Sequence, residues 1–267
     1  MSIRIKEVTE LIEAFAPLSY QASYDNAGLI VGRDEESVRG ILLAVDVTQE
    51  VIEEAKRVGA NLIITHHPII FHPLKRLNSA SYVERCVEEA IRSGIALYAC
   101  HTNLDSTPNG MSWRLAAQLG VTNLEVLEST SNLADVGYGV VGELSEPMAF
   151  DTYIDHVAAI LNLESIRHSQ PIGRPIKRVA ICTGAGGSLI SRVRQSKADL
   201  YITSDLKYND FMEPNSQFVI ADIGHFESEY CAIDILYDII SKKMFNFAVR
   251  KSETSCNPII YKGFSIR

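Results

Sequence analysis

Two adjacent histidines, His66 and His67, follow an apolar run in the stretch ITHHPIIF. Neighbouring residues of a strand point to opposite faces, so two imidazoles can share one site only where the strand has ended. Imidazole nitrogens are ligands of zinc, iron, manganese and related cations. The pair therefore raises the question of which other ligands the chain supplies.

Two further apolar runs end in groups of the same kind. His101 and Asp105 follow the run IALYAC, and His225 and Glu229 follow the run QFVIAD. In open α/β sheets the working residues collect at the carboxyl ends of the strands. Imidazoles and carboxylates at three predicted strand ends therefore indicate a metal site.

The spacing favours more than one cation. His225 and Glu229 stand four residues apart at the start of a predicted helix, so they share one helical face. A carboxylate placed there can bridge two cations, and His66 and His67 on an irregular loop can each reach a different one. So few ligands leave open coordination positions, which is typical of a catalytic site.

Each of these residues, taken alone, is more often an ordinary surface group than a ligand. Only the combination at three strand ends favours the metal site. The remaining histidines that we considered have no such setting, and we predict that they are ordinary residues: His72, His156 and His168.

The elements that must position these groups alternate along the chain. Apolar, β-branched runs predict buried strands, and amphipathic segments between them predict helices. The predicted strands lie in 40–48, 61–65 and 95–100, and the predicted helices in 49–60, 81–94 and 110–120. This order predicts a mainly parallel sheet with helices on both sides.

The pattern changes at the Gly-rich, strand-like segment 131–147, and a second α/β series follows it up to about residue 222. We place boundaries near Leu127 and Asp222. The sequence thus predicts an α/β protein of two domains with mainly parallel sheets. The first domain is discontinuous, with residues 1–127 plus 223–267, and the second has residues 128–222.

Composition limits the kinds of protein that the chain can be. The net charge is −8 over 267 residues, which argues against a general nucleic-acid or membrane surface. The five cysteines form no C-x-x-C pair and are typical of reduced intracellular thiols. The N-terminal stretch has no long apolar run, so we expect neither a signal peptide nor a membrane span, and a cytoplasmic location.

Six motifs occur in an order and spacing that resemble a known family. They are YDNAGLIVG, ITHHPIIF, YACHTNLD, AICTGAGGSLI, DLYITSD and GHFESE. The chain resembles, over nearly its whole length, the Nif-three-like family (NGG-interacting factor three), whose members are named as type-2 GTP cyclohydrolase I homologues.

The resemblance implies a dinuclear metal centre in the cleft between the two α/β domains. It implies two divalent cations per chain: one held by His66 and His225, the other by His67 and Asp105, with Glu229 as the bridge. Zinc, iron, manganese, cobalt and nickel all suit these mixed ligands. Similar proteins assemble as a ring-shaped hexamer built from dimers.

Several motif residues allow two interpretations. Many relatives have IKHH after DLYITSD, whereas this chain has Tyr208 and Asn209 in place of the histidine pair. Asp205 either faces the metal cleft or caps the following helix. The Gly184–Gly187 turn is either an anion-binding nest or a tight packing turn. Asp25, in the segment DNAGL, lies either beside the metals or in a plain loop turn.

Our leading hypothesis is a two-metal hydrolase, in which His101 assists as a proton shuttle or as a partner behind the metal ligands. A hydrogen-bonded structural role for His101 is the alternative. The substrate could be a guanine nucleotide, a phosphoester or an amide. A non-enzymatic metal-binding adaptor and a nucleic-acid-binding ring are the rival functions, and we expect no cofactor beyond the metals.

Overall fold

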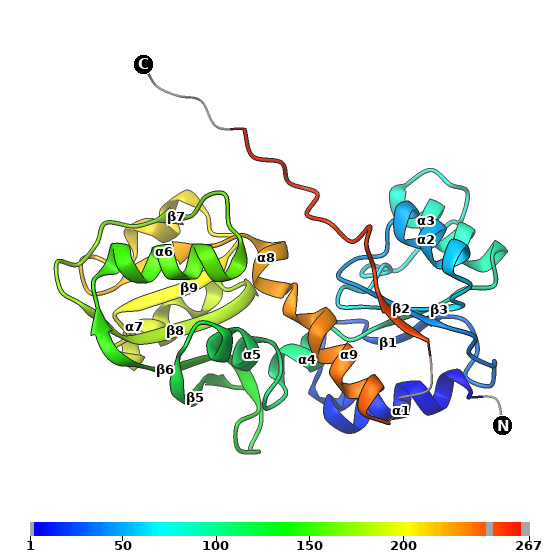
Figure 1. Ribbon diagram of the computed structural model, residues 1–267, viewed down its shortest axis with the longest axis horizontal. Coiled ribbons are helices and arrows are strands. Elements are labelled where there is room, and N and C mark those ends of the chain that lie inside the picture. The colour runs from blue at the N-terminus through cyan, green and yellow to red at the C-terminus, as the bar shows by residue number, and fades with distance from the viewer. Residues whose placement is uncertain (1–2, 244–247, 263–267) are drawn as a thin grey trace. The chain divides into compact units, whose positions relative to one another are not determined.

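The computed structural model describes residues 3–243 and 248–262 and divides the chain into two compact units (Figure 1). The first unit comprises Met1–Gly110 and Tyr230–Cys256, and the second comprises Met111–Glu229 and Asn257–Arg267. The first unit is therefore discontinuous in sequence. These units divide the chain at other positions than Leu127 and Asp222, and the domain boundaries near those two residues stay a prediction.

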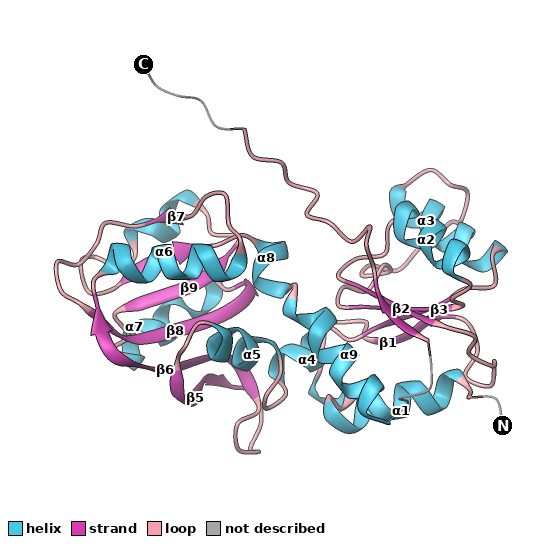
Figure 2. Ribbon diagram, in the orientation of Figure 1, coloured by secondary structure: helices cyan, strands magenta, loops and turns pink. Residues whose placement is uncertain are grey.

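The first unit contains a mixed sheet in which parallel pairs predominate. Among the described residues the strand order is β1-β4-β3-β2-β11, and only the β1/β4 pair is antiparallel. In Figure 2, α2 and α3 lie on one side of this sheet and α1 and α9 on the other. The elements of this unit are α1 (Ile5–Phe15), η1 (Leu18–Tyr20), β1 (Gly28–Val31), β2 (Ile41–Ala44), α2 (Gln49–Val58), β3 (Leu62–Thr65), α3 (Tyr82–Arg92), β4 (Ala96–Ala99), α4 (Thr102–Ser106), α9 (Cys231–Lys243) and β11 (Val249–Lys251).

Local sequence explains these elements well. All residues of β2, β3 and β4 are buried, because helices cover both faces of the sheet and leave no solvent side for polar residues. Helix α2 begins after Thr48, whose side chain accepts a hydrogen bond from the Val51 backbone N–H. It ends at Gly59 in the left-handed conformation. The predicted alternation is thus confirmed here.

The second unit has a sheet of mixed direction. In the described part of the chain the order is β5-β6-β8-β9-β10-β7, where only β8/β9 and β9/β10 are parallel. The elements are α5 (Met111–Gln118), β5 (Thr122–Ser129), β6 (Gly137–Met148), α6 (Phe150–Leu161), β7 (Arg167–His168), β8 (Ile176–Ala185), η2 (Gly187–Leu189), α7 (Ile190–Ser196), β9 (Leu200–Ser204), η3 (Tyr208–Met212), β10 (Val219–Asp222) and α8 (His225–Glu229).

The antiparallel half of this sheet comes from the Gly-rich segment. Strand β6 pairs with β5 as a long hairpin, and Gly137 lies so close to the Glu128 carbonyl that a Cβ would collide with it. Glycine therefore permits the close approach of the two strands. The expectation of a mainly parallel sheet did not foresee this hairpin, because hairpin pairing depends on strand contacts rather than on apolar periodicity.

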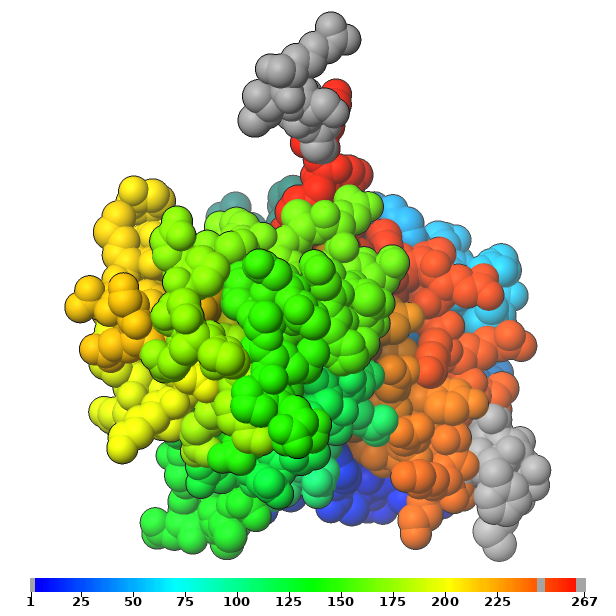
Figure 3. Space-filling model, turned by 60° about the vertical axis from the view of Figure 1, so that its left-hand side comes forward, coloured from blue at the N-terminus to red at the C-terminus, as the bar shows by residue number. Residues whose placement is uncertain are grey.

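The exposed C-terminal segment and the character of the helices complete the description. The C-terminal segment, red in Figure 3, stands out from the surface, and the Ile260 side chain is 91% exposed. None of the helices in 3–243 and 248–262 has the length and apolar character that a membrane crossing requires.

Candidate metal centre

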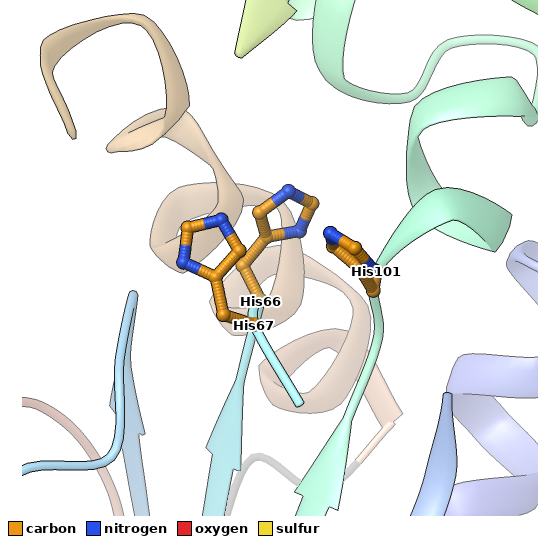
Figure 4. Close-up of side chains that lie close together, drawn as sticks. All are labelled: His66, His67 and His101. Carbon is orange, nitrogen blue, oxygen red and sulfur yellow. The ribbon is translucent and has the colours of Figure 1, made fainter. Parts of the chain in front are cut away.

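Three histidines of the first unit gather just beyond the carboxyl ends of two neighbouring strands (Figure 4). His66 and His67 follow β3, and His101 follows β4. Strands β3 and β4 are parallel, with Thr65 beside Ala99, so both chains leave the sheet at the same edge. One ring nitrogen from each histidine lies within 4.8 Å of the others. This arrangement could hold a metal ion.

His66 is fully buried and its tautomer is fixed. Its Nδ1 lies 2.9 Å from the Cys100 carbonyl oxygen. A carbonyl oxygen only accepts, so Nδ1 carries a proton and Nε2 is the ring nitrogen that faces the rest of the cluster. Nε2 lies 3.6 Å from Asp105 Oδ1. The structure thus brings Asp105 to His66, whereas the resemblance paired Asp105 with His67.

His67 is oriented by a carboxylate. Its Nδ1 lies 2.8 Å from Asp46 Oδ1, and its backbone N–H donates to the Val45 carbonyl. Such carboxylate–histidine pairs orient metal-ligating imidazoles and raise their basicity. The sequence interpretation missed Asp46, although it follows β2 and so obeys the same strand-end rule that found the histidines.

His101 is oriented by the motif residue Asp25. His101 Nδ1 lies 2.7 Å from Asp25 Oδ1, and the second Asp25 oxygen accepts hydrogen bonds from the Thr102 backbone N–H and hydroxyl. Burial alone would raise the pKa of Asp25, but the hydrogen bonds from His101, Thr102 and Asn26 outweigh it and lower the pKa to about 2. Asp25 is therefore ionised and lies beside the histidines, rather than in a plain loop turn.

The second unit supplies a histidine–glutamate pair on α8. His225 Nε2 lies 2.9 Å from Glu229 Oε2, and the Glu229 side chain is buried. His225 Nδ1 lies 2.8 Å from Asp205 Oδ2. The following helix η3 has Lys207, not Asp205, at its cap position. Of the two interpretations of Asp205, the structure therefore favours a role beside the candidate metal ligands.

The Gly-rich segment at the end of β8, which begins at Gly184, packs against this pair. Gly184 has a φ of +64°, and a Cβ on it would collide with the Glu229 carboxylate. Its backbone N–H donates to Ser228 Oγ at 2.9 Å. At Gly186 a Cβ would collide with Thr203 and Tyr201. The turn is thus a packing turn that makes room for Glu229, and the Gly184 N–H is already used.

Four histidines from the two units share one arrangement. In each of them Nδ1 contacts an oxygen acceptor, which directs Nε2 to the remaining partners. The acceptors are Cys100 O for His66, Asp46 for His67, Asp25 for His101 and Asp205 for His225. Within each unit, the oriented imidazoles and a carboxylate, Asp105 in the first and Glu229 in the second, are donor groups of the kind that divalent transition metals bind.

The comparisons with known proteins agree with one another. The sequence matches the family described as Duf34/NIF3 (NGG1p interacting factor 3) over residues 3–258. It is 34% identical over 231 residues to a Clostridium perfringens protein named GTP cyclohydrolase 1 type 2 homolog, covering 85% of this chain and 87% of that one. A Campylobacter jejuni protein of the same name is 33% identical, covering 85% of this chain and 88% of that one.

Solved structures share the fold. A Staphylococcus aureus hypothetical protein superposes with a TM-score of 0.90 at 26% identity, covering 98% of this chain and all of that chain. A Bacillus cereus protein related to NIF3 gives a TM-score of 0.89 at 23% identity, with the same coverage. At that identity the second likeness concerns the fold alone.

Proposed function

We propose, for a chain that belongs to the Duf34/NIF3 family, that it binds two divalent cations and uses them in hydrolysis. The ligands in this proposal are His66, His67, Asp105, His225 and Glu229. Asp105 shares the cation of His66, because these two side chains face each other at 3.6 Å. Glu229 is the ligand common to both cations, as the family resemblance implies.

One observation supports this proposal above the others. Every histidine of the ligand set has its Nδ1 engaged with an oxygen, although the acceptors come from different loops: Cys100, Asp46 and Asp205. His168, which we expect to be an ordinary residue, also has its Nδ1 2.9 Å from an oxygen, but this is the carbonyl of the next residue, Ser169. The acceptors of the ligand set lie 20 or more residues away along the chain. Outer hydrogen bonds of this kind fix the ligating nitrogen in metal sites.

The residues of the chain have separate tasks in such a centre. When bound, the two cations would supply Lewis acidity for the activation of water and the polarisation of substrate. His66 is held deep in the first unit by the Cys100 carbonyl, which keeps its Nε2 in place. Asp46 and Asp205 hold His67 and His225 in the tautomer that a cation requires. Gly184 leaves space for the Glu229 carboxylate.

The metal centre and the names of relatives support three candidate substrate classes. Curated relatives are named GTP cyclohydrolase 1 type 2 homolog. We propose an electrophilic substrate opened by activated water, either a guanine nucleotide, a phosphoester or an amide. Screening the zinc-, manganese- and iron-loaded chain against these three classes tests the proposal. A chain that keeps its metals but turns over none of them would be a metal-binding protein instead.

Metal content tests the ligand assignment directly. Elemental analysis of the metal-saturated wild type should give about two divalent ions per chain, as the two-metal centre requires. Glu229→Ala should lose most of both ions. The matched control is Glu227→Ala on the same helix. Glu227 Oε1 accepts a hydrogen bond from the Asn257 side chain, and Glu227 is not a ligand in this proposal. Retention of both ions by Glu229→Ala would remove Glu229 as the shared ligand.

We also propose that the chain forms a homo-oligomer, most simply the hexamer, a trimer of dimers, that the family resemblance implies. Light scattering at micromolar concentration tests it. A monomer at all concentrations would contradict it.

A further inference from the structure

A cavity of about 260 Å³ lies within the second unit. Its walls come from three places: the loop 162–165 after α6, helix α8, and the C-terminal segment 257–261, which is red in Figure 1. None of the candidate metal ligands is among the described residues that line it. The chemistry of this cavity can therefore be considered separately from that of the metal centre.

The C-terminal wall of the cavity is held in place by Asn257. The Asn257 side-chain Nδ2 donates to Glu227 Oε1 at 2.7 Å. The Oδ1 of the same side chain accepts from the Ile259 backbone N–H at 2.8 Å. One side chain thus ties the C-terminal segment to α8 and fixes the direction in which the segment leaves it. The cavity is therefore a formed feature of the second unit.

The polar side of the cavity is negative. Glu164 and Glu227 both line it, whereas no lysine or arginine does so among the described residues. Helix α6 ends at Leu161 beside the cavity, with Asn162 as its cap and no basic residue in its last turn. The C-terminus of a helix carries a partial negative charge that a cation stabilises. Two carboxylates and a helix C-terminus thus create a potential that favours a positively charged ligand.

Glu227 has one oxygen that lacks a hydrogen-bond donor. Its Oε1 accepts from Asn257, but its Oε2 is buried and accepts no hydrogen bond within the described ranges 3–243 and 248–262. Gly224 has a φ of +92°, and a Cβ on it would collide with this Oε2. A buried carboxylate oxygen without a donor is costly. A ligand with N–H donors and a positive charge would offset that cost.

The other side of the cavity is apolar. Leu163, Ile259 and Tyr261 line it, and the last two are exposed. The pKa of Tyr261 is raised, first by burial and then by the negative charges of Glu227 and Asp222, so the carboxylates also act on this wall. An inorganic ion gains nothing from an apolar wall. An alkyl chain attached to a cationic group gains free energy there, because the wall removes it from water.

We propose that this cavity binds a small organic cation, an alkyl chain of a few carbons that ends in an ammonium or guanidinium group. The cationic group lies at Glu164, Glu227 and the C-terminus of α6, and the chain lies on Leu163 and Ile259. Ligand pockets typically have volumes of about 300–1,000 Å³, so this cavity suits a molecule at the small end of that range. The inference goes beyond the proposed metal function and does not depend on it.

An NMR titration of the full-length chain tests the proposal with n-butylammonium, and n-butanol serves as the uncharged isostere. n-Butylammonium should shift the backbone amide signals of 162–165 and 257–261. It should bind at least about tenfold more tightly than n-butanol, because hydrogen bonds to charged groups are the stronger ones. Equal affinities of the two probes, including no binding of either, would overturn the proposal.

Two further probes separate an organic cation from a simple ion. Methylammonium keeps the charge but loses most of the chain, so it should bind about tenfold more weakly than n-butylammonium. Carboxylate and amide oxygens are also ligands of Ca²⁺, and Ca²⁺ is therefore the competing occupant. Displacement of bound n-butylammonium by an equal concentration of Ca²⁺, or equal affinities of the two ammonium probes, would overturn the organic cation.

Substitution of the two carboxylates gives a second measurement. Glu227→Gln keeps the shape of the side chain and an acceptor for Asn257, and should weaken n-butylammonium binding by about tenfold. Glu164→Gln should weaken it less, because the Glu164 carboxylate is more exposed. Glu146→Gln is the matched control, since Glu146 is an exposed glutamate of β6 that does not line the cavity. If Glu227→Gln and Glu164→Gln both bind the probe as tightly as the wild type, the carboxylates do not hold the cation and the proposal is wrong.

Discussion

In both units an aspartate orients a histidine through a hydrogen bond to Nδ1, but the backbone conformation of that aspartate differs between the units. In the first unit, Asp25 and Asp46 act from residues outside the left-handed region. In the second unit, Asp205 has a φ of +55°, and the turn that faces Glu229 contains Gly184 at +64°. Backbone strain of this kind is kept where it positions functional groups. Ligands of both units thus follow strand ends, but only in the second unit do the residues that contact them, Asp205 and Gly184, lie in left-handed backbone.

The first unit in turn depends on a buried carboxylate that lies away from its histidines. Glu54 of α2 accepts hydrogen bonds from Ser252 Oγ at 2.6 Å and from the Thr254 backbone N–H at 3.1 Å. The same segment carries Ser255, whose Oγ accepts from the Val45 N–H, next to Asp46. Glu54 therefore braces the strand end that holds His67.

The largest expected effect comes from removing this brace. Glu54→Ala should lower the free energy of unfolding by about 3 kcal/mol, because buried donors lose a charged acceptor. Urea denaturation measures it. Glu50→Ala, an exposed residue of the same helix, should cost less than about 1 kcal/mol. Similar losses for the two variants would show that the first unit does not depend on Glu54.

The next effect tests the strained turn of the second unit. Gly184→Ala should cost about 2 kcal/mol, because alanine resists the positive φ and its Cβ collides with Glu229. It should also lower metal content, measured by elemental analysis. Gly187→Ala is the control, since its nearest neighbours would lie 3.5 Å or more from the new Cβ. Full metal content in Gly184→Ala would contradict the placement of Glu229 by this turn.

The pH dependence of the free energy of unfolding tests Glu54 of the first unit in a second way. Burial alone raises the pKa of Glu54, but hydrogen bonds from Ser252, Glu253 and Thr254 lower it below its ordinary value of 4.5. The unfolded state therefore takes up the proton first as the pH falls. The contribution of Glu54 to the free energy of unfolding should be complete above pH 4.5, the ordinary pKa of the group, and should be lost as the pH falls through the lowered pKa of the folded state. Glu54→Gln should flatten the unfolding free energy in that acidic range; an unchanged pH profile would contradict it.

The smallest effect makes the same substitution in both units. Asp205→Gly should raise the free energy of unfolding by about 0.5 kcal/mol, because glycine relieves the left-handed backbone. Asp46→Gly should lower it by about 1 kcal/mol, since it adds freedom to the unfolded chain and removes the hydrogen-bond partner of His67. Both variants should bind zinc about 10- to 100-fold more weakly. A loss of stability in Asp205→Gly would show that the backbone there is not strained.

Part of the fold could be predicted because it is local. Apolar runs and caps such as Thr48 and Gly59 predicted the parallel strands and α2 of the first unit. The hairpin of β5 and β6 could not be predicted in this way. The antiparallel pairing of β5 and β6 brings Gly137 close to the Glu128 carbonyl. Such a contact between two strands leaves no periodic pattern in the sequence.

The sequence by itself determined which residues are candidates for metal binding: His66, His67, Asp105, His225 and Glu229 stand at strand ends or at helical spacing, and both are local properties. Only the tertiary structure decided which acceptor orients which imidazole. Asp25 meets His101 across 76 residues, and Asp46 meets His67 across 21. It also brought Asp105 to His66 and Gly184 to Glu229. These contacts arise because parallel strands and turns bring distant loops to one edge of a sheet, and no spacing along the chain encodes that distance.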